Sequence, residues 1–209
     1  MVIRAVLTSS SPRSYLEIGS EPEEVKGIKQ MSKQKLASKE FLLLVNGPSC
    51  GGKSTVSKIL LEKYGGIFNA KGDHIKWLIS DYDAATHRGV VHEMTLELVK
   101  IALVNKLSVL KEGGLFEPEK LVDIAKEHNV AFFVVNISAP KKVLDSRFLE
   151  RIEAKKNGAK ISNVDPKRFD ELYKMYLSTK MESPLEFDSS VQAPEEIAAA
   201  IAGYIQAHI

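Results

Sequence analysis

The sequence predicts an α/β fold with three layers, α/β/α, in which helices cover both faces of a parallel sheet. Two apolar runs, residues 41–45 and 130–135, lack the polar alternation of half-exposed strands, so they are expected to be parallel strands buried on both faces. Stretches with helical spacing lie between and after these runs, and strands that alternate with helices are typical of parallel sheets. A chain of 209 residues is long enough for one such domain.

The composition argues against several classes of protein. A hydrophobic share of 44% and a charged share of 27% are ordinary for a globular domain. The 29 basic and 27 acidic residues nearly balance, which argues against a dedicated nucleic-acid binder. The single cysteine, Cys50, rules out an intrachain disulfide and fits a reducing compartment. No apolar run reaches the roughly 18 residues of a membrane-spanning helix, so we expect no membrane partner and a cytoplasmic protein.

Residues 1–39 are expected to be an N-terminal extension that precedes a domain of residues 40–209. Arg4 and Arg13 stand among serines in a first segment without acidic residues, a composition that resembles an organellar transit peptide. The alternative is an extension upstream of a start at Met31, with no role in the fold. We favour this alternative because a composition match over so few residues is weak.

The first predicted strand is followed by a helix, a short strand and a small second helix. Residues 53–64 place apolar side chains at helical spacing until a glycine pair ends the helix. Residues 67–69 form a short strand candidate, and residues 75–79 open a small helix. The polar residues 81–88 are expected to form a loop.

One long helix is expected over residues 92–111, followed by an alternation of shorter elements. Its apolar face is formed by Leu96, Val99, Leu103, Leu107 and Leu110. The remaining helices are expected at residues 118–128, 140–156, 167–180 and 194–208, the remaining strands at 130–136 and 185–187, and a polar loop at 155–164. Asp165 is placed to cap the helix that begins after it.

A glycine-rich motif joins the first strand to the first helix. Gly47–Ser54 satisfies G-x-x-x-x-G-K-[ST], and it lies between a buried strand and a helix, which is the context that the motif requires. In such a P-loop, backbone N–H groups and the helix dipole hold phosphate oxygens. Lys53 would reach the β- and γ-phosphates of ATP, and the Ser54 hydroxyl would ligate Mg²⁺. The predicted nucleotide-binding set is Gly47, Pro48, Ser49, Cys50, Gly51, Gly52, Lys53, Ser54 and Thr55.

Cys50 lies inside this loop, where a small residue fits. A thiol near a helix N-terminus can also have a lowered pKa, which would make Cys50 redox-sensitive. We carry that as a minor hypothesis.

The rest of the chain narrows the kind of P-loop protein. Residues 134–140, after the second buried strand, lack the Asn-Lys-x-Asp motif of switch GTPases. That strand ends in Asn136 rather than in the acidic residue of motor-like ATPases. At this length the remaining common option is a small kinase.

Four stretches carry a resemblance to a known group: residues 47–55, Gly72-Asp73, residues 138–151 and residues 187–190. The chain from about residue 40 onward resembles compact P-loop kinases of the zeta-toxin-like and chloramphenicol-phosphotransferase-like group, and more distantly gluconate and adenylylsulfate kinases. This resemblance implies a P-loop kinase fold with a helical lid.

The resemblance also implies roles for individual residues. Asp73 would be the general base, the alternative being a helix N-cap. Arg147 and Arg151 would clamp phosphates from one helix face, the alternative being surface ion pairs. Asp188 and Ser189 would lie under the adenine. Arg88, His74, Lys76 and Trp77 could line the acceptor pocket, although a tryptophan is more often part of the core. Lys155, Lys156 and Lys160 are expected to be solvated charges on the lid.

One region departs from the group's pattern. These kinases usually have a strand after the long helix, often with an acidic end, and residues 111–117 are too short for one. Either the sheet is reduced, or Leu115 and Phe116 make a stub and Glu117 stands in for the acid. The leading expectation is an ATP- and Mg²⁺-dependent kinase acting on a hydroxyl of a small molecule or nucleotide. The alternatives are a regulatory or degenerate kinase, which the short region favours, and a polynucleotide end kinase, which the balanced charge disfavours.

Overall fold

A computed structural model describes residues 33–113, 117–159 and 165–209 of the chain. The transit-peptide and upstream-start interpretations concern residues outside this range. Among the residues just before the first strand, Leu36 is buried in the core and Lys35 forms a parallel bridge with Gly65.

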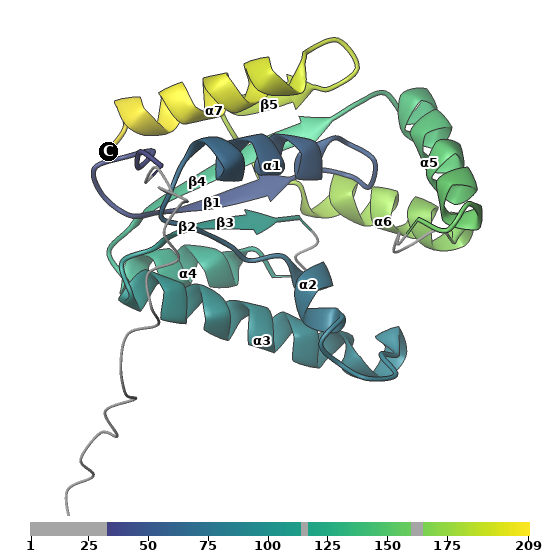
Figure 1. Ribbon diagram of the computed structural model, residues 1–209, viewed down its shortest axis with the longest axis horizontal. Coiled ribbons are helices and arrows are strands. Elements are labelled where there is room, and N and C mark those ends of the chain that lie inside the picture. Colours follow the sequence, from purple (N-terminus) through teal and green to yellow (C-terminus); the bar gives the residue numbers. More distant parts are fainter. Residues whose placement is uncertain (1–32, 114–116, 160–164) are drawn as a thin grey trace, which may run out of the picture. The chain divides into compact units, whose positions relative to one another are not determined.

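Five parallel strands form one sheet in the order β2-β3-β1-β4-β5 (Figure 1). The central strand is the first apolar run of the sequence, and the second apolar run lies beside it. The strands are β1 (Phe41–Asn46), β2 (Ile67–Asn69), β3 (Ser108–Glu112), β4 (Ala131–Ser138) and β5 (Leu185–Asp188).

Helices cover both faces of this sheet, which confirms the predicted three-layer α/β/α fold. α1 (Lys53–Lys63) and α7 (Pro194–Ala207) pack on one face, where Val56, Leu60 and Ile201 meet alternate residues of β1 and β4. α3 (Ala84–Val104) and α4 (Glu119–Glu127) pack on the other, through residues such as Val99 and Leu121. Within the described residues, no helix is long and apolar enough to cross a membrane.

Two further helices, α5 (Lys141–Lys156) and α6 (Pro166–Thr179), lie beyond the carboxyl ends of the strands (Figure 1). The rings of Phe148 in α5 and Phe169 in α6 stack with their centroids 4.2 Å apart. Asp165 caps α6 as predicted, because its carboxylate accepts a hydrogen bond of 3.0 Å from the Lys167 amide. Helices α5 and α6 together form a helical layer over the carboxyl ends of the strands.

The long helix predicted over residues 92–111 is wrong at both ends. α3 begins at Ala84, inside the predicted loop, because the Asp83 side chain caps it by accepting a hydrogen bond from the Thr86 amide. The helix ends at Val104, and Lys106 adopts a φ of 59° where the chain turns. The next residues form β3, a fully buried strand between β2 and β1.

The error has a physical cause. Val109 and Leu110 pack on opposite faces of the sheet, one in each core cluster, and such a short apolar run fits a helix as well as a strand. The sheet is therefore not reduced, and the strand that seemed missing is present. Leu115 and Phe116 lie outside the described residues.

Candidate active site

The β1–α1 loop, residues 47–52, curls at the carboxyl edge of the sheet. Gly47 has a φ of +151°, and a Cβ there would lie 2.0 Å from the carbonyl oxygen of Ile137 in β4. No other amino acid fits so close to that neighbouring backbone. The loop also holds Cys50 and Gly52 at positive φ, and the Gly51 amide donates to the Pro48 carbonyl at 3.2 Å. The strand–loop–helix arrangement is the one that the motif predicts.

The first turn of α1 is suited to an anion. Its N-cap residue, Gly52, carries no capping side chain, and the first turn holds no acidic residue. In the described part of the chain, the amides of Gly52, Lys53 and Ser54 donate to no protein acceptor. Unpaired N–H groups at a helix N-terminus attract negatively charged oxygens. The loop therefore fits a phosphate chain.

Lys53 folds back over this loop. Its Nζ donates to the carbonyl oxygens of Gly47 at 2.9 Å and Pro48 at 2.6 Å. Burial lowers the pKa of Lys53 to about 8, and the nearby Glu112 carboxylate opposes that effect only in part. A phosphate group could replace the two carbonyl oxygens as the acceptor for this ammonium group.

The Ser54 hydroxyl lies directly against a buried acid. Its Oγ donates to Oε2 of Glu112 at 2.7 Å. Glu112 is the last residue of β3, and its side chain is only 7% exposed. Sequence reasoning missed Glu112 because it assigned the preceding residues to a helix. The available signal was the apolar pair Val109 and Leu110, followed two residues later by an acid just before Gly113.

Glu117, the predicted stand-in for this acid, lies elsewhere. It pairs with Lys120 at 2.5 Å and with His92 at 3.6 Å. It is not among the residues that line the large cavity beside the P-loop, which is described below. The expectation that Glu117 replaces the missing acid is therefore wrong, since Glu112 already ends the neighbouring strand.

Two further lysines meet at Glu112, and the sequence analysis did not single them out for this site. Lys71 Nζ lies 3.1 Å from Glu112 Oε2 and 2.9 Å from Ser54 Oγ. Lys111, only 5% exposed, donates to the carbonyl oxygens of Glu112 at 2.8 Å and Gly113 at 3.2 Å. Burial lowers the pKa of Lys111 to about 8. Together with Lys53, these lysines make the floor of the site strongly positive.

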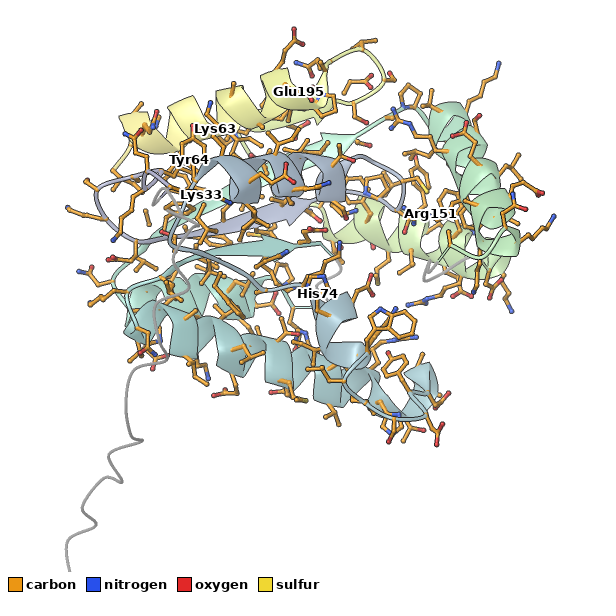
Figure 2. The ribbon with its side chains drawn as sticks, viewed as in Figure 1. Lys33, Lys63, Tyr64, His74, Arg151 and Glu195 are labelled. Carbon is orange, nitrogen blue, oxygen red and sulfur yellow. The ribbon has the colours of Figure 1, made fainter. Side chains whose placement is uncertain are left out.

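The arginines of α5 behave differently from each other. Arg147 donates to the Cys50 carbonyl at 3.2 Å, to Ser189 Oγ at 2.9 Å and to the Ser189 carbonyl at 2.8 Å. It thus ties the P-loop to the loop after β5, in place of the surface ion pairs considered as an alternative. Arg151 makes no hydrogen bond or ion pair to another described residue, and its charge acts on Cys50 and Lys53. Figure 2 shows Arg151 and His74 on the side of the strands' carboxyl ends.

The lowered pKa proposed for Cys50 is wrong. Burial raises the pKa of this thiol, and the charges of Arg151, Lys53 and Arg147 do not offset it. The neutral thiol is less reactive than a thiolate, so the loop gives no support for a redox role.

Asp73 lies in the first turn of α2 (Gly72–Lys76). The N-cap residue of this helix is Lys71, so the alternative role of Asp73 as an N-cap is wrong. Its Oδ1 is 2.9 Å from Lys76 Nζ, and both residues line the cavity beside the P-loop.

Trp77 directly follows α2 and is 65% exposed, so it is not part of the core. Its ring lies 5.0 Å from Lys76 Nζ. The four residues predicted for the acceptor pocket all line one cavity, and they are His74, Lys76, Trp77 and Arg88.

This cavity measures about 1490 Å³ and runs from the P-loop to α2, α3 and α6. A site for one small ligand usually has 300–1,000 Å³, so the cavity has room for two ligands. Ser189 lines it on the P-loop side. Asp188 does not, because its carboxylate accepts hydrogen bonds from Ser190, which lower its pKa and shape the turn. On the lid, Lys156 pairs with Glu153, and Lys160 lies outside the described residues.

Comparison with known proteins shows which solved structures share this fold. No family model and no curated protein matches the chain. Among solved structures, a candidate kinase from Chloroflexus aurantiacus aligns with a TM-score of 0.61 at 19% identity, covering 82% of this chain and 99% of that one. A sugar kinase from a Janibacter species gives 0.53 at 17% identity, covering 79% and 94%. Shikimate kinase from Aquifex aeolicus gives 0.50 at 18% identity, covering 79% and 96%.

At these identities the likeness shows the fold. The chain has the three-layer architecture of P-loop-type kinases, with a five-stranded parallel sheet. The narrower resemblance to the zeta-toxin-like and chloramphenicol-phosphotransferase-like group goes beyond what these structures establish.

Proposed function

We propose that this protein is an ATP-dependent phosphotransferase that moves the γ-phosphate to a hydroxyl of a small molecule or nucleotide. The observation that carries the proposal is the contact of 2.7 Å between Ser54 Oγ and Glu112 Oε2, directly beside the P-loop. A hydroxyl at the start of the P-loop helix and a carboxylate at the end of a neighbouring strand are the two protein ligands that hold Mg²⁺ in P-loop enzymes.

The residues present fit a magnesium–nucleotide complex. The open amides at the start of α1 fit phosphate oxygens, and Ser54 and Glu112 offer the hard oxygen ligands that Mg²⁺ prefers. When bound, Mg²⁺ would neutralise negative charge on the β- and γ-phosphates. Lys53 would exchange its carbonyl acceptors for phosphate oxygens, and Arg151 would add charge from the lid.

Arg147 and Ser189 would shape the nucleotide side of the cavity. Because Arg147 holds the P-loop and the loop after β5 together, it keeps Ser189 next to Gly52, where an adenine ring would lie. Arg147 would therefore act mainly by positioning these two loops. Asp188 would contribute by holding the turn.

The acceptor would bind on the opposite side of the cavity. Asp73 would accept the proton of the attacking hydroxyl, with Lys76 orienting its carboxylate. Trp77 offers an exposed aromatic face for the acceptor, while α6 contributes Tyr176 and Arg168 to the cavity wall. Excluding water beneath α5 and α6 would favour transfer to the acceptor over hydrolysis.

The degenerate-kinase alternative rested on a missing strand and its acid. β3 and Glu112 remove that support. The near balance of 29 basic and 27 acidic residues still disfavours a polynucleotide end kinase, although Lys76, Arg88 and Arg168 add basic groups to the cavity wall.

The test is transfer of label from γ-labelled ATP, with Mg²⁺, to members of a metabolite and nucleoside library. We expect one acceptor class to be labelled by the wild type and not by Lys53→Ala. The matched control is Lys58→Ala, which removes an exposed lysine of the same helix. Within the described residues Lys58 pairs only with Glu62, so this change should leave transfer intact. Nucleotide binding without transfer to any acceptor would contradict the proposal.

A further inference from the structure

The ammonium group of Lys71 occupies the place between the two proposed magnesium ligands. It lies 2.9 Å from Ser54 Oγ and 3.1 Å from Glu112 Oε2, and those two atoms are 2.7 Å apart. The three groups form a closed triangle of hydrogen-bond distances. A second cation in the same place would have to compete with Lys71 for both oxygens.

The surroundings explain why a cation is held there. Glu112 is almost fully buried, and a buried carboxylate without a partner is strongly destabilising. Lys71 reaches it from the N-cap position of α2, just after β2, which pairs with β3 in parallel register. Lys76, a few residues on, pairs instead with Asp73, and among the described residues Lys71 alone forms an ion pair with the Glu112 carboxylate.

We propose that Lys71 is an internal counter-ion that holds Ser54 and Glu112 in ligand geometry until the metal–nucleotide complex binds. The inference rests on the magnesium site of the proposed function. When the complex binds, Ser54 and Glu112 would hold the metal, and the Lys71 ammonium would turn away from this pair toward the phosphate chain. Lys71 is thus a positioning residue for the metal site.

This arrangement also selects the form in which the metal enters. Lys71 contacts the buried Glu112 carboxylate, and Lys53 and Lys111 add positive charge beside it, so the floor repels a free divalent cation and attracts a polyphosphate. The nucleotide-free protein therefore binds free metal poorly, while the metal–nucleotide complex, whose net charge is negative, binds well.

The test is titration of the nucleotide-free protein with Mn²⁺, following free Mn²⁺ by electron paramagnetic resonance. Lys71→Met should bind Mn²⁺ about tenfold or more tightly than the wild type, because the competing charged contacts are gone. Adding Glu112→Gln to that variant should abolish the gain. Lys58→Met, on the exposed side of α1, should behave as the wild type.

Equal Mn²⁺ affinity of the wild type and Lys71→Met would overturn the inference, as would a gain that survives Glu112→Gln. Circular dichroism checks folding, and Lys71→Gln replaces Lys71→Met if the latter unfolds.

A parallel melting experiment with Mg²⁺ and ATP separates the two proposals. Stabilisation of the wild type by Mg²⁺ and ATP, together with equal Mn²⁺ affinities, means that the counter-ion inference alone fails. No stabilisation of any variant by Mg²⁺ and ATP means that the proposed function fails.

Discussion

Raising the pH from 7 to 9 should weaken nucleotide binding, because the phosphates need a charged Lys53. In the nucleotide-free protein the pKa of Lys53 is about 8, lowered chiefly by burial. Phosphates bound beside the ammonium group raise that pKa, since an opposite charge favours the charged form. Between pH 8 and this higher value, the complex holds more protons than the free protein. Binding therefore takes up protons in this window, and affinity falls as the pH rises through it.

The size of the effect follows from the pKa of about 8. At pH 8 the free lysine is about half protonated, so binding takes up about half a proton. At pH 9 it takes up about nine-tenths of a proton, and the affinity is about tenfold lower than at pH 7.

Titration calorimetry in two buffers with different ionisation enthalpies measures this proton uptake. Lys111 also has a pKa of about 8, so the experiment is done in a Lys111→Met background. Absence of uptake at pH 9 in that background would refute the reasoning, and so would uptake that persists in Lys53→Met.

Four further predictions concern the P-loop, Arg147 and two residues on the acceptor side. Gly47→Ala should abolish nucleotide binding and lower the melting temperature, because the new Cβ would lie 2.0 Å from the Ile137 carbonyl oxygen. The control Gly203→Ala, in open space on α7, should stabilise the folded protein by about 0.5–1 kcal/mol. Similar melting temperatures for both variants would contradict this reasoning. Arg147→Ala should lower the free energy of unfolding by about 1–3 kcal/mol, measured by urea denaturation, since it removes three hydrogen bonds. Full rescue by Arg147→Lys would argue against a role for the forked guanidinium. Asp73→Asn should slow turnover by about 100-fold or more with ATP affinity unchanged, and retained turnover excludes the general-base role. Because Trp77 is the only tryptophan, its fluorescence should report acceptor binding, and an acceptor that leaves the emission unchanged would argue against this side of the cavity.

The parts of the site that lie close together in the sequence could be predicted from it. The strand, the glycine loop and the helix of residues 41–63 carry their own signals, which are apolar continuity, glycines at fixed spacing and helical periodicity. The cap at Asp165 is equally local. Each of these depends on residues a few positions apart.

The parts that depend on distant contacts could not be predicted. Whether the residues around Leu110 form helix or strand is decided by their place between β2 and β1, which no local pattern records. Glu112 was lost with that strand, and Lys71 became recognisable only when β2 and β3 were seen side by side. Cys50 shows the same limit, because its pKa depends on burial by the surrounding chain.

The central claim, that Ser54 and Glu112 hold the metal of a phosphotransfer site, is tested most directly by measuring ATP affinity with and without Mg²⁺. We expect Mg²⁺ to tighten ATP binding by about tenfold or more in the wild type and to have little effect in Ser54→Ala and Glu112→Gln. An equal gain from Mg²⁺ in the wild type and in Glu112→Gln would show that the metal is held elsewhere and would contradict the account.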